Sequence, residues 1–212
     1  MSDFFDRLEQ VRTRWNVLEH PFYQRWSNGE LTKAELAVYS GQYRHAVVAI
    51  ADASANAAAA AEGRLAEGLA EHAREEADHV RLWDGFVDSV GGDAGVSATP
   101  ETAACATEWA GTAERPLLDT LVTLYSIESG QPAISETKRD GLIARYGYTP
   151  ESPATEYFDL HAVLDIEHAE QARKAIEPQL EGADEEALLA TAERALRANW
   201  ELLDGVDKLL AS

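Results

Sequence analysis

Hydrophobic residues recur at helical spacing along almost the whole chain, and no stretch shows the alternation that is typical of a β-strand. The pattern therefore predicts an all-α protein of about seven helices. We expect these helices over residues 3–18, 32–63, 64–90, a shorter stretch before 115, and then 115–146, 153–176 and 185–210. Because no internal repeat or linker separates the segments, residues 1–212 are expected to form one helical bundle.

Local signals support several of these boundaries. Thr32 and Glu35 match the capping box that opens a helix. Gly91 follows the third helical segment and predicts its end. Gly130 and Pro132 interrupt the segment 115–146, because proline removes a backbone donor inside a helix. We expect the helix to be broken there and space to open beside it.

The charge of the chain restricts its partners. Its 38 acidic and 18 basic residues give a formal net charge of −20, and such a surface repels the phosphates of nucleic acids and anionic membranes. No apolar run approaches the ~20 residues that a membrane span needs, and the N-terminal segment lacks a signal-peptide pattern. We therefore expect a soluble cytoplasmic protein without nucleic-acid or membrane partners.

The single cysteine, Cys105, excludes an intramolecular disulfide and any cysteine-rich zinc or iron–sulfur site. It lies in a run of small residues, ETAACATEWAG, and no histidine is near it in the sequence. We interpret Cys105 as a structural residue rather than a catalytic thiol, because nothing in its sequence context would activate a nucleophile.

The most informative segment reads YFDLHAVLDIEHAEQA. His161, Asp165 and His168 are spaced i, i+4, i+7, so all three project from one face of a helix. Apolar residues such as Tyr157 and Ile176 lie on the same face, which predicts that it is buried. Burying two imidazoles and a carboxylate is costly unless a metal ion compensates. A hydrogen-bonded polar cluster or a solvent-lined cleft is the alternative interpretation.

A second segment, EHAREEADHVRLWDGF, also places polar residues on a helical face that is predicted to be buried. Glu75 and His79 lie four residues apart on a face that also carries apolar residues, and they resemble half of a carboxylate-bridged metal site. A surface pair is the simpler interpretation of these two residues alone. Glu76 and His72 lie nearby, and His72, one turn earlier, is the main rival for a ligand or supporting role.

Glu128 is the third contribution, since Leu121 and Leu124 share its helical face. The six predicted ligands combine three imidazoles with three carboxylates, a donor set that suits iron or manganese better than magnesium, calcium or structural zinc. Six such ligands are too many for one ion with open positions, so two ions are expected. The predicted metal ligands are Glu75, His79, Glu128, His161, Asp165 and His168.

These residues resemble those of the haem-oxygenase-like dinuclear iron oxygenases, a fold shared with the thiaminase-like and pyrroloquinoline-quinone-synthase proteins. The resemblance covers nearly the whole chain and implies an all-α, haem-oxygenase-like bundle without haem. The segments HPFY and E-x9-K also resemble those of the self-sacrificing para-aminobenzoate synthases. In that group a tyrosine supplies the aromatic product and a lysine its nitrogen. The matching positions here are Tyr23 and Lys138.

The resemblance implies an O2-dependent oxygenase for folate biosynthesis that needs two ions, Fe/Fe or Mn/Fe, and an external reductant. It also implies a homodimer. Cleaving the tyrosine Cα–Cβ bond requires a strong oxidant, which a tyrosyl radical can relay. Tyr157, one turn before His161, is the best placed relay, and the other candidates are Tyr39, Tyr43 and Tyr125.

Three departures from the family pattern leave alternatives open. The metal segment EEADH is shorter, Ile127 replaces an expected tyrosine before Glu128, and Gly130-Gln131 changes the sequence after it. A multiple-turnover oxygenase acting on an external small molecule needs the same ligands but neither Tyr23 nor Lys138. A non-enzymatic helical interaction module predicts no metal at all. A thiaminase-like hydrolase is disfavoured by the context of Cys105.

Overall fold

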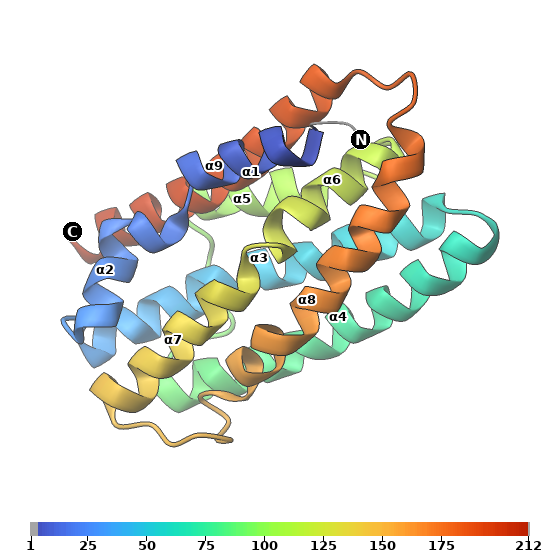
Figure 1. Ribbon diagram of the computed structural model, residues 1–212. Coiled ribbons are helices and arrows are strands. Elements are labelled where there is room, and N and C mark those ends of the chain that lie inside the picture. Colours follow the sequence, from blue (N-terminus) through green and yellow to red (C-terminus); the bar gives the residue numbers. More distant parts are fainter. Residues whose placement is uncertain (1–3, 212) are drawn as a thin grey trace.

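The computed structural model describes residues 4–211, and all regular elements in that range are helices (Figure 1). The nine α-helices are α1 (Phe4–Arg14), α2 (Pro21–Asn28), α3 (Lys33–Ala60), α4 (Gly63–Val90), α5 (Pro100–Ala110), α6 (Leu117–Glu128), α7 (Gln131–Tyr146), α8 (Glu156–Ile176) and α9 (Glu185–Leu210). Two short 3-10 helices, η1 (Val17–Glu19) and η2 (Glu177–Gln179), complete the set. None of the helices in this range is long and apolar enough to cross a membrane.

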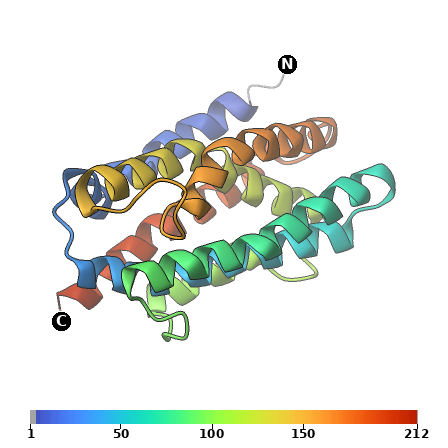
Figure 2. The ribbon, with the colours of Figure 1, turned by 90° about the horizontal axis from the view of Figure 1, so that it is seen from below.

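The longest helices, α3 and α4, run antiparallel and pack side by side along the bundle (Figures 1 and 2). The alanine-rich part of α3 allows this close approach, since Ala53 and Ala57 are fully buried. Helix α8 crosses the bundle and contacts α4, α6 and α7, whereas α9 packs on α1, α5 and α6. The faces of α4, α6 and α8 therefore meet inside the bundle.

Two predicted helix ends are confirmed. The Thr32 side chain accepts a hydrogen bond from the Glu35 backbone N–H, and the Glu35 side chain accepts one from the Thr32 N–H, which completes the capping box of α3. Helix α4 ends at Gly91, whose left-handed φ of 74° favours glycine.

The predicted break in the segment 115–146 is confirmed, since Ser129 and Gly130 separate α6 from α7. The predicted number of helices was too low because one further helix was missed. The segment after α1 contains α2, because His20 caps it through its side chain and Pro21 occupies the first turn. Helix α1 also ends earlier than predicted, at Arg14, since Asn16 caps a short 3-10 helix instead.

Helix α2 packs closely on α7. A Cβ at Gly141 would lie 2.7 Å from the Trp26 ring, so only glycine permits this approach. The Trp26 indole donates a hydrogen bond to the Lys138 carbonyl at 3.0 Å. The contact fixes the position of Tyr23, one turn earlier on α2, relative to Lys138 on α7. Cys105 is also fully buried, in agreement with a structural role.

Candidate metal centre and buried amine site

Helix α4 contributes three polar residues to the interior of the bundle. The side chains of His72, Glu76 and His79 are buried, with exposed fractions of 8%, 3% and 4%. The three residues lie within two turns of α4. Spacings of three and four residues place all three side chains on the same face. That face packs against α8.

Helices α6 and α8 supply the remaining members of the cluster. His161, Asp165 and His168 of α8 are all buried, as the sequence predicted, and Glu128 at the end of α6 is 2% exposed. Glu128 Oε1 lies 3.2 Å from His72 Nε2, and Asp165 Oδ1 lies 3.5 Å from His168 Nδ1. The structure thus brings together three helices that are distant in sequence.

The four imidazoles form two pairs with Glu76 between them. The His72 and His168 ring centres are 4.3 Å apart, and those of His79 and His161 are 4.6 Å apart. Glu76 Oε1 lies 3.1 Å from His79 Nδ1, 3.6 Å from His72 Nε2 and 3.8 Å from His168 Nδ1. Two groups of potential ligands result, His72–Glu76–His168 and Glu76–His79–His161, each with its ligand atoms within 4.8 Å of one another.

The donor atoms of this cluster fit a metal site because they face one another without forming hydrogen bonds. In the described part of the chain, ten buried side-chain nitrogen and oxygen atoms make no hydrogen bond, and seven belong here. Leaving such groups buried and unpaired costs free energy, which coordination of a metal ion offsets. The seven atoms are His72 Nε2, both carboxylate oxygens of Glu128, His161 Nε2, both carboxylate oxygens of Asp165, and His168 Nδ1.

Two histidines are oriented by hydrogen bonds on the side away from the cluster. His161 Nδ1 lies 2.7 Å from the Tyr157 carbonyl oxygen, which only accepts, so Nδ1 carries the proton and Nε2 presents its lone pair. His168 Nε2 likewise donates to the Glu75 carboxylate at 3.1 Å and leaves Nδ1 facing the cluster. Metal-binding histidines commonly use such a second hydrogen bond to fix their tautomer and ring orientation.

The structure favours Glu76 over the predicted Glu75 as the ligand from α4. The Glu75 side chain is 41% exposed and reaches the cluster only through His168, whereas Glu76 lies between the histidine pairs. The side chain of Glu75 thus holds the His168 ring in place. His72, the rival considered from the sequence, faces the cluster directly and joins the candidate ligands.

Electrostatic interactions within the cluster shift its pKa values in opposite directions. Burial acts to raise the pKa of Glu76, but contacts with the His72 and His79 rings hold it well below its usual range. Burial raises the pKa of Asp165 to about 7 and lowers that of His161 to about 4. Burial also opposes the charge on His72, yet Glu128 and Glu76 raise its pKa to about 10. The cluster thus mixes charged and neutral donors.

A second buried site surrounds the amine of Lys138, which is only 2% exposed. No ion pair among the described residues includes Lys138. Burial therefore lowers the pKa of this amine to about 7. Its Nζ atom lies over five aromatic rings, at 5.0 Å from the ring centre of Tyr23, 5.6 Å from Tyr39, 4.6 Å from Tyr43, 5.8 Å from Trp83 and 5.6 Å from Phe158. We call these five residues the aromatic cage.

Tyr23 is held within this cage by α2. The ring is 1% exposed, and its hydroxyl forms a 2.8 Å hydrogen bond with the hydroxyl of Tyr39. Helix α2 is capped by His20, whose Nδ1 accepts a hydrogen bond from the Phe22 backbone N–H. The histidine of the HPFY segment therefore has a capping role, and it positions the tyrosine three residues later.

Aromatic rings connect the cage with the metal cluster. Tyr39 and Tyr43 have ring centres 5.3 Å apart, and Tyr43 lies 5.1 Å from Trp83. Trp83 lies 4.8 Å from Tyr157, which stacks on His161 at 3.9 Å. The sequence interpretation missed the central position of Trp83, although its spacing of four from His79 placed it on the same helical face. Tyr125 lies outside this series and packs edge-on against Phe5.

Comparison with known proteins defines the class of this protein. A family model described as an iron-containing redox enzyme matches residues 37–200. The chain therefore belongs to this family of iron-containing redox enzymes, in agreement with the predicted oxygenase class. The cluster of histidines and carboxylates is the candidate site for the metal of this family.

Two relatives that match nearly the whole chain are 4-aminobenzoate synthases. The 4-aminobenzoate synthase of Chlamydia muridarum is 30% identical over 95% of this chain and 89% of that protein. The 4-aminobenzoate synthase of Nitrosomonas europaea is 26% identical over 97% of this chain and 91% of that protein. Because both matches extend over almost the whole chain, the compared region spans the positions of Tyr23, the metal cluster and Lys138.

Solved structures confirm the predicted fold. A Shewanella denitrificans domain with a haem-oxygenase-like fold matches with a TM-score of 0.80 and 21% identity, covering 100% of this chain and 94% of that chain. A TenA homologue from Pseudomonas syringae matches with a TM-score of 0.79 and 16% identity, covering 97% and 91% of the two chains. The all-α, haem-oxygenase-like architecture is therefore established.

Proposed function

We propose that this protein is a self-sacrificing 4-aminobenzoate synthase for folate biosynthesis. It consumes the side chain of its own Tyr23 and takes the amino nitrogen from Lys138, using O2 and an external reductant. The observation that carries this proposal is the position of the Lys138 amine, 5.0 Å over the Tyr23 ring in a cage without an ion-pair partner. The 4-aminobenzoate synthases among its relatives support the same product.

The cluster would hold two metal ions. His72, Glu128 and His168 would bind one ion, His79 and His161 the other, with Glu76 shared and Asp165 completing the set. Imidazole and carboxylate donors suit both iron and manganese, so the Fe/Fe and Mn/Fe forms are both compatible with this chain. When bound, the ions supply the O2 activation that the oxidation of a tyrosine side chain requires.

The carbon skeleton of the product is already present in tyrosine. The ring and the benzylic Cβ provide all seven carbons of 4-aminobenzoate, once the Cα–Cβ bond is broken and Cβ is oxidised to a carboxylate. The para oxygen then leaves as water while the Lys138 Nζ atom bonds to that ring carbon. The Cε–Nζ bond of Lys138 must also break to free the product, and Cε is oxidised to an aldehyde in this step, with O2 as the oxidant and the released water as the source of the aldehyde oxygen. Tyr23 is nearly free of solvent, so the surroundings exclude water as a competing nucleophile at the ring.

Lys138 is suited to deliver the nitrogen. With a pKa near 7, about half of the amines are unprotonated at neutral pH and present a lone pair. The amine lies 5.0 Å from the centre of the Tyr23 ring, close enough for small movements to bring its nitrogen onto a ring carbon. The Tyr39 hydroxyl, 2.8 Å from that of Tyr23, can accept and return the phenol proton at that oxygen.

The neighbouring rings provide a path for electron transfer from Tyr23 to the metal cluster. The path runs from Tyr23 through Tyr39, Tyr43 and Trp83 to Tyr157, and the Tyr157 ring stacks on His161. Burial raises the pKa of Tyr157 well above its usual range, so the phenol stays protonated until it is oxidised. We assign Tyr157 the role of relay beside the metal cluster, as the sequence predicted.

Two substitutions test the proposal against an oxygenase that acts on an external substrate. Tyr23→Phe and Lys138→Ala should each abolish 4-aminobenzoate formation while leaving bound iron unchanged, because neither residue is a ligand. The unmodified protein should form at most one product per chain. Matched controls are Tyr148→Phe and Lys33→Ala, which lie outside the aromatic cage and should retain the product yield. Full activity in both test variants would contradict the proposal. The homodimer stays a prediction.

A further inference from the structure

A cavity of about 450 Å³ opens on the opposite side of the metal cluster from the aromatic cage. It lies between the first half of α4, the middle of α6 and the second half of α8, and His72 and His168 line it. Its volume falls within the range of small-molecule sites. Most of the wall is apolar, formed by Leu65, Leu69, Leu121, Leu124, Ala172 and Ala175.

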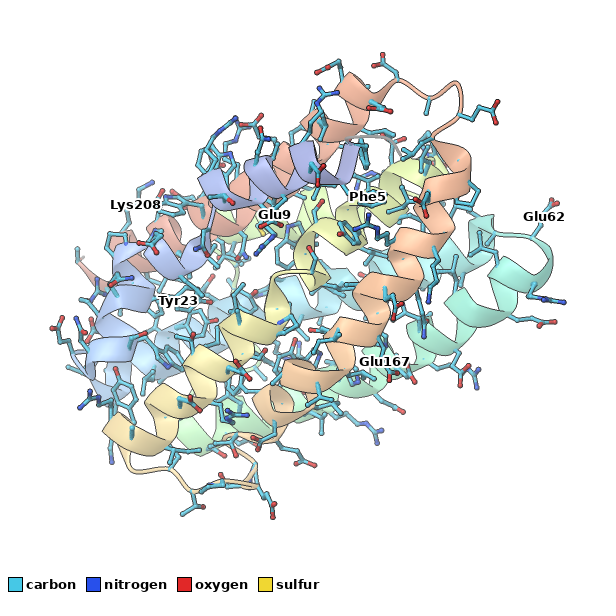
Figure 3. The ribbon with its side chains drawn as sticks, in the orientation of Figure 1. Phe5, Glu9, Tyr23, Glu62, Glu167 and Lys208 are labelled. Carbon is cyan, nitrogen blue, oxygen red and sulfur yellow. The ribbon has the colours of Figure 1, made fainter. Side chains whose placement is uncertain are left out.

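The cavity is separate from the proposed reaction at Tyr23. Neither Tyr23 nor Lys138 lines it. The start of α4 marks the outer end of the cavity, since Arg64 and Leu65 are in its lining. In Figure 3, Glu62 of the adjoining turn and Tyr23 lie towards opposite ends of the molecule. The cavity therefore approaches the metal cluster from a second direction.

The charges around the cavity differ from those of the rest of the chain. Its lining contains two cations, Arg64 and Lys174, and no acidic residue, although acidic residues outnumber basic ones by 38 to 18 in the chain. Lys174 pairs with Glu170 at 3.0 Å, but both side chains are more than 60% exposed, so this pair is weak. Arg64 takes part in no ion pair among the described residues.

The beginning of α4 adds to the attraction for an anion. Arg64 and Leu65 lie in its first turn, and the N-cap residue Glu62 makes no side-chain capping hydrogen bond. The first backbone N–H groups of this 28-residue helix thus remain available at the outer end of the cavity. Glu62 itself points outward from the turn in Figure 3.

We infer that this cavity binds a small carboxylic acid with an apolar body. The carboxylate would lie at Arg64 and Lys174, and the apolar body would extend between the leucines towards His72 and His168. The inference goes beyond the proposed function, because it gives the metal cluster a site for a molecule other than Tyr23. Two sources share this chemistry, the protein's own product 4-aminobenzoate and an acid taken from solution.

Gly68 allows the cavity to be filled with little disturbance. It lies in the lining within α4, and a Cβ at this position would meet no atom within 4 Å. Gly68→Phe should therefore project a ring into the cavity, while Gly68→Ala is the matched control that improves helix propensity without filling the space. Gly68→Leu serves as a second filling variant if the larger ring prevents folding.

The experiment is an anaerobic calorimetric titration of the Fe(II)-loaded protein with octanoate, with 1-octanol as the uncharged probe. We expect octanoate to bind in the unmodified protein and in Gly68→Ala, and to lose about tenfold or more in affinity in Gly68→Phe or Gly68→Leu. Replacing both cations, Arg64→Ser with Lys174→Ser, should weaken octanoate by about tenfold and leave 1-octanol unchanged. Arg81→Ser, on the same helix but outside the lining, is the charge control.

Two results would overturn the inference, namely no octanoate binding to the unmodified protein, or equal binding to the filled variants. Titration with 4-aminobenzoate in competition with octanoate then distinguishes the sources. Displacement of octanoate by 4-aminobenzoate at similar concentration assigns the cavity to the product. Octanoate binding without such displacement assigns it to an external acid. Both arms are independent of Tyr23→Phe, so this test and the test of the proposed function can fail separately.

Discussion

The metal cluster and the aromatic cage both bury ionisable side chains, but they stabilise them in opposite ways. In the cluster, carboxylates and imidazoles lie within 3–4 Å of one another and share charge, as Glu76 does with His72 and His79. In the cage, the amine of Lys138 lies near five aromatic rings, and two of these residues, Tyr23 and Tyr39, share a hydrogen bond between their hydroxyls.

This difference separates the tasks of the two regions. A cluster of donors with unpaired lone pairs is suited to hold cations, because each ion replaces the missing hydrogen bonds. An isolated amine in an apolar cage loses its proton near neutral pH and becomes a nucleophile. One region thus supplies oxidation and the other supplies nitrogen, and Trp83 lies between them.

The largest effect is expected at Glu76, because this residue belongs to both groups of potential metal ligands. Glu76→Ala should weaken iron binding at both positions by more than about 100-fold and abolish product, since it removes the oxygen ligand that both ions share. Iron content after desalting, together with product yield, measures this. Glu75→Ala is the matched comparison, and it should weaken iron binding by about 10–100-fold through loss of the His168 hydrogen bond. A greater loss for Glu75→Ala than for Glu76→Ala would reverse the assignment.

A smaller effect is expected on stability when the buried amine is removed. The ordinary lysine pKa of 10.5 applies to the unfolded chain, while the native pKa is about 7. Between these values the unfolded chain binds a proton that the native protein does not, so native stability rises with pH in this window. Below pH 7 both states carry the charge, and the native protein bears its full burial cost.

Lys138→Met lacks this dependence. We therefore expect the variant to have a higher free energy of unfolding than the unmodified protein, with the largest difference at or below pH 7. This difference should shrink by about 4 kcal/mol towards pH 10. Urea unfolding at pH 7 and pH 10 measures the change, and the exposed Lys33→Met is the control. A difference that does not vary with pH would show that Lys138 has an ordinary pKa.

The smallest effect concerns the connection between the two regions. Trp83→Phe keeps a ring between Tyr43 and Tyr157 but removes the indole and its 2.8 Å hydrogen bond to the Ser40 carbonyl. We expect a partial loss of product yield, roughly tenfold or less, with bound iron unchanged. Trp83→Leu, which removes the ring, should lower the yield further. Equal yields in both variants and the unmodified protein would exclude the path through Trp83.

Much of the metal site followed from helical periodicity, but the choice between two neighbouring glutamates did not. At about 100° per residue, Glu75 and Glu76 lie roughly 50° on either side of the direction shared by His72 and His79. The sequence of α4 alone therefore cannot show which of the two glutamates faces the metal cluster. The position of α8, which turns His161 and His168 towards one side of α4, makes Glu76 the inner residue and Glu75 the outer one.

The aromatic cage was harder to predict for a related reason. Its five residues come from α2, α3, α4 and α8, and the amine that they surround comes from α7, so no single helical face contains them. The resemblance to known synthases identified Tyr23 and Lys138, but their proximity depends on the close packing at Gly141. Helix α2 itself was missed, because eight residues with a side-chain cap give too short a periodic pattern.

Isotope transfer shows whether the carbons and the nitrogen of the product come from the protein itself. The protein is produced with ring- and β-¹³C tyrosine and ε-¹⁵N lysine, then incubated with unlabelled Fe(II), O2 and reductant, and the released 4-aminobenzoate is analysed by mass spectrometry. If Tyr23 and Lys138 are consumed, the product carries both the ¹³C skeleton and one ¹⁵N atom, with a matching loss of mass at Tyr23. A product that lacks both labels would show that its atoms come from an external substrate.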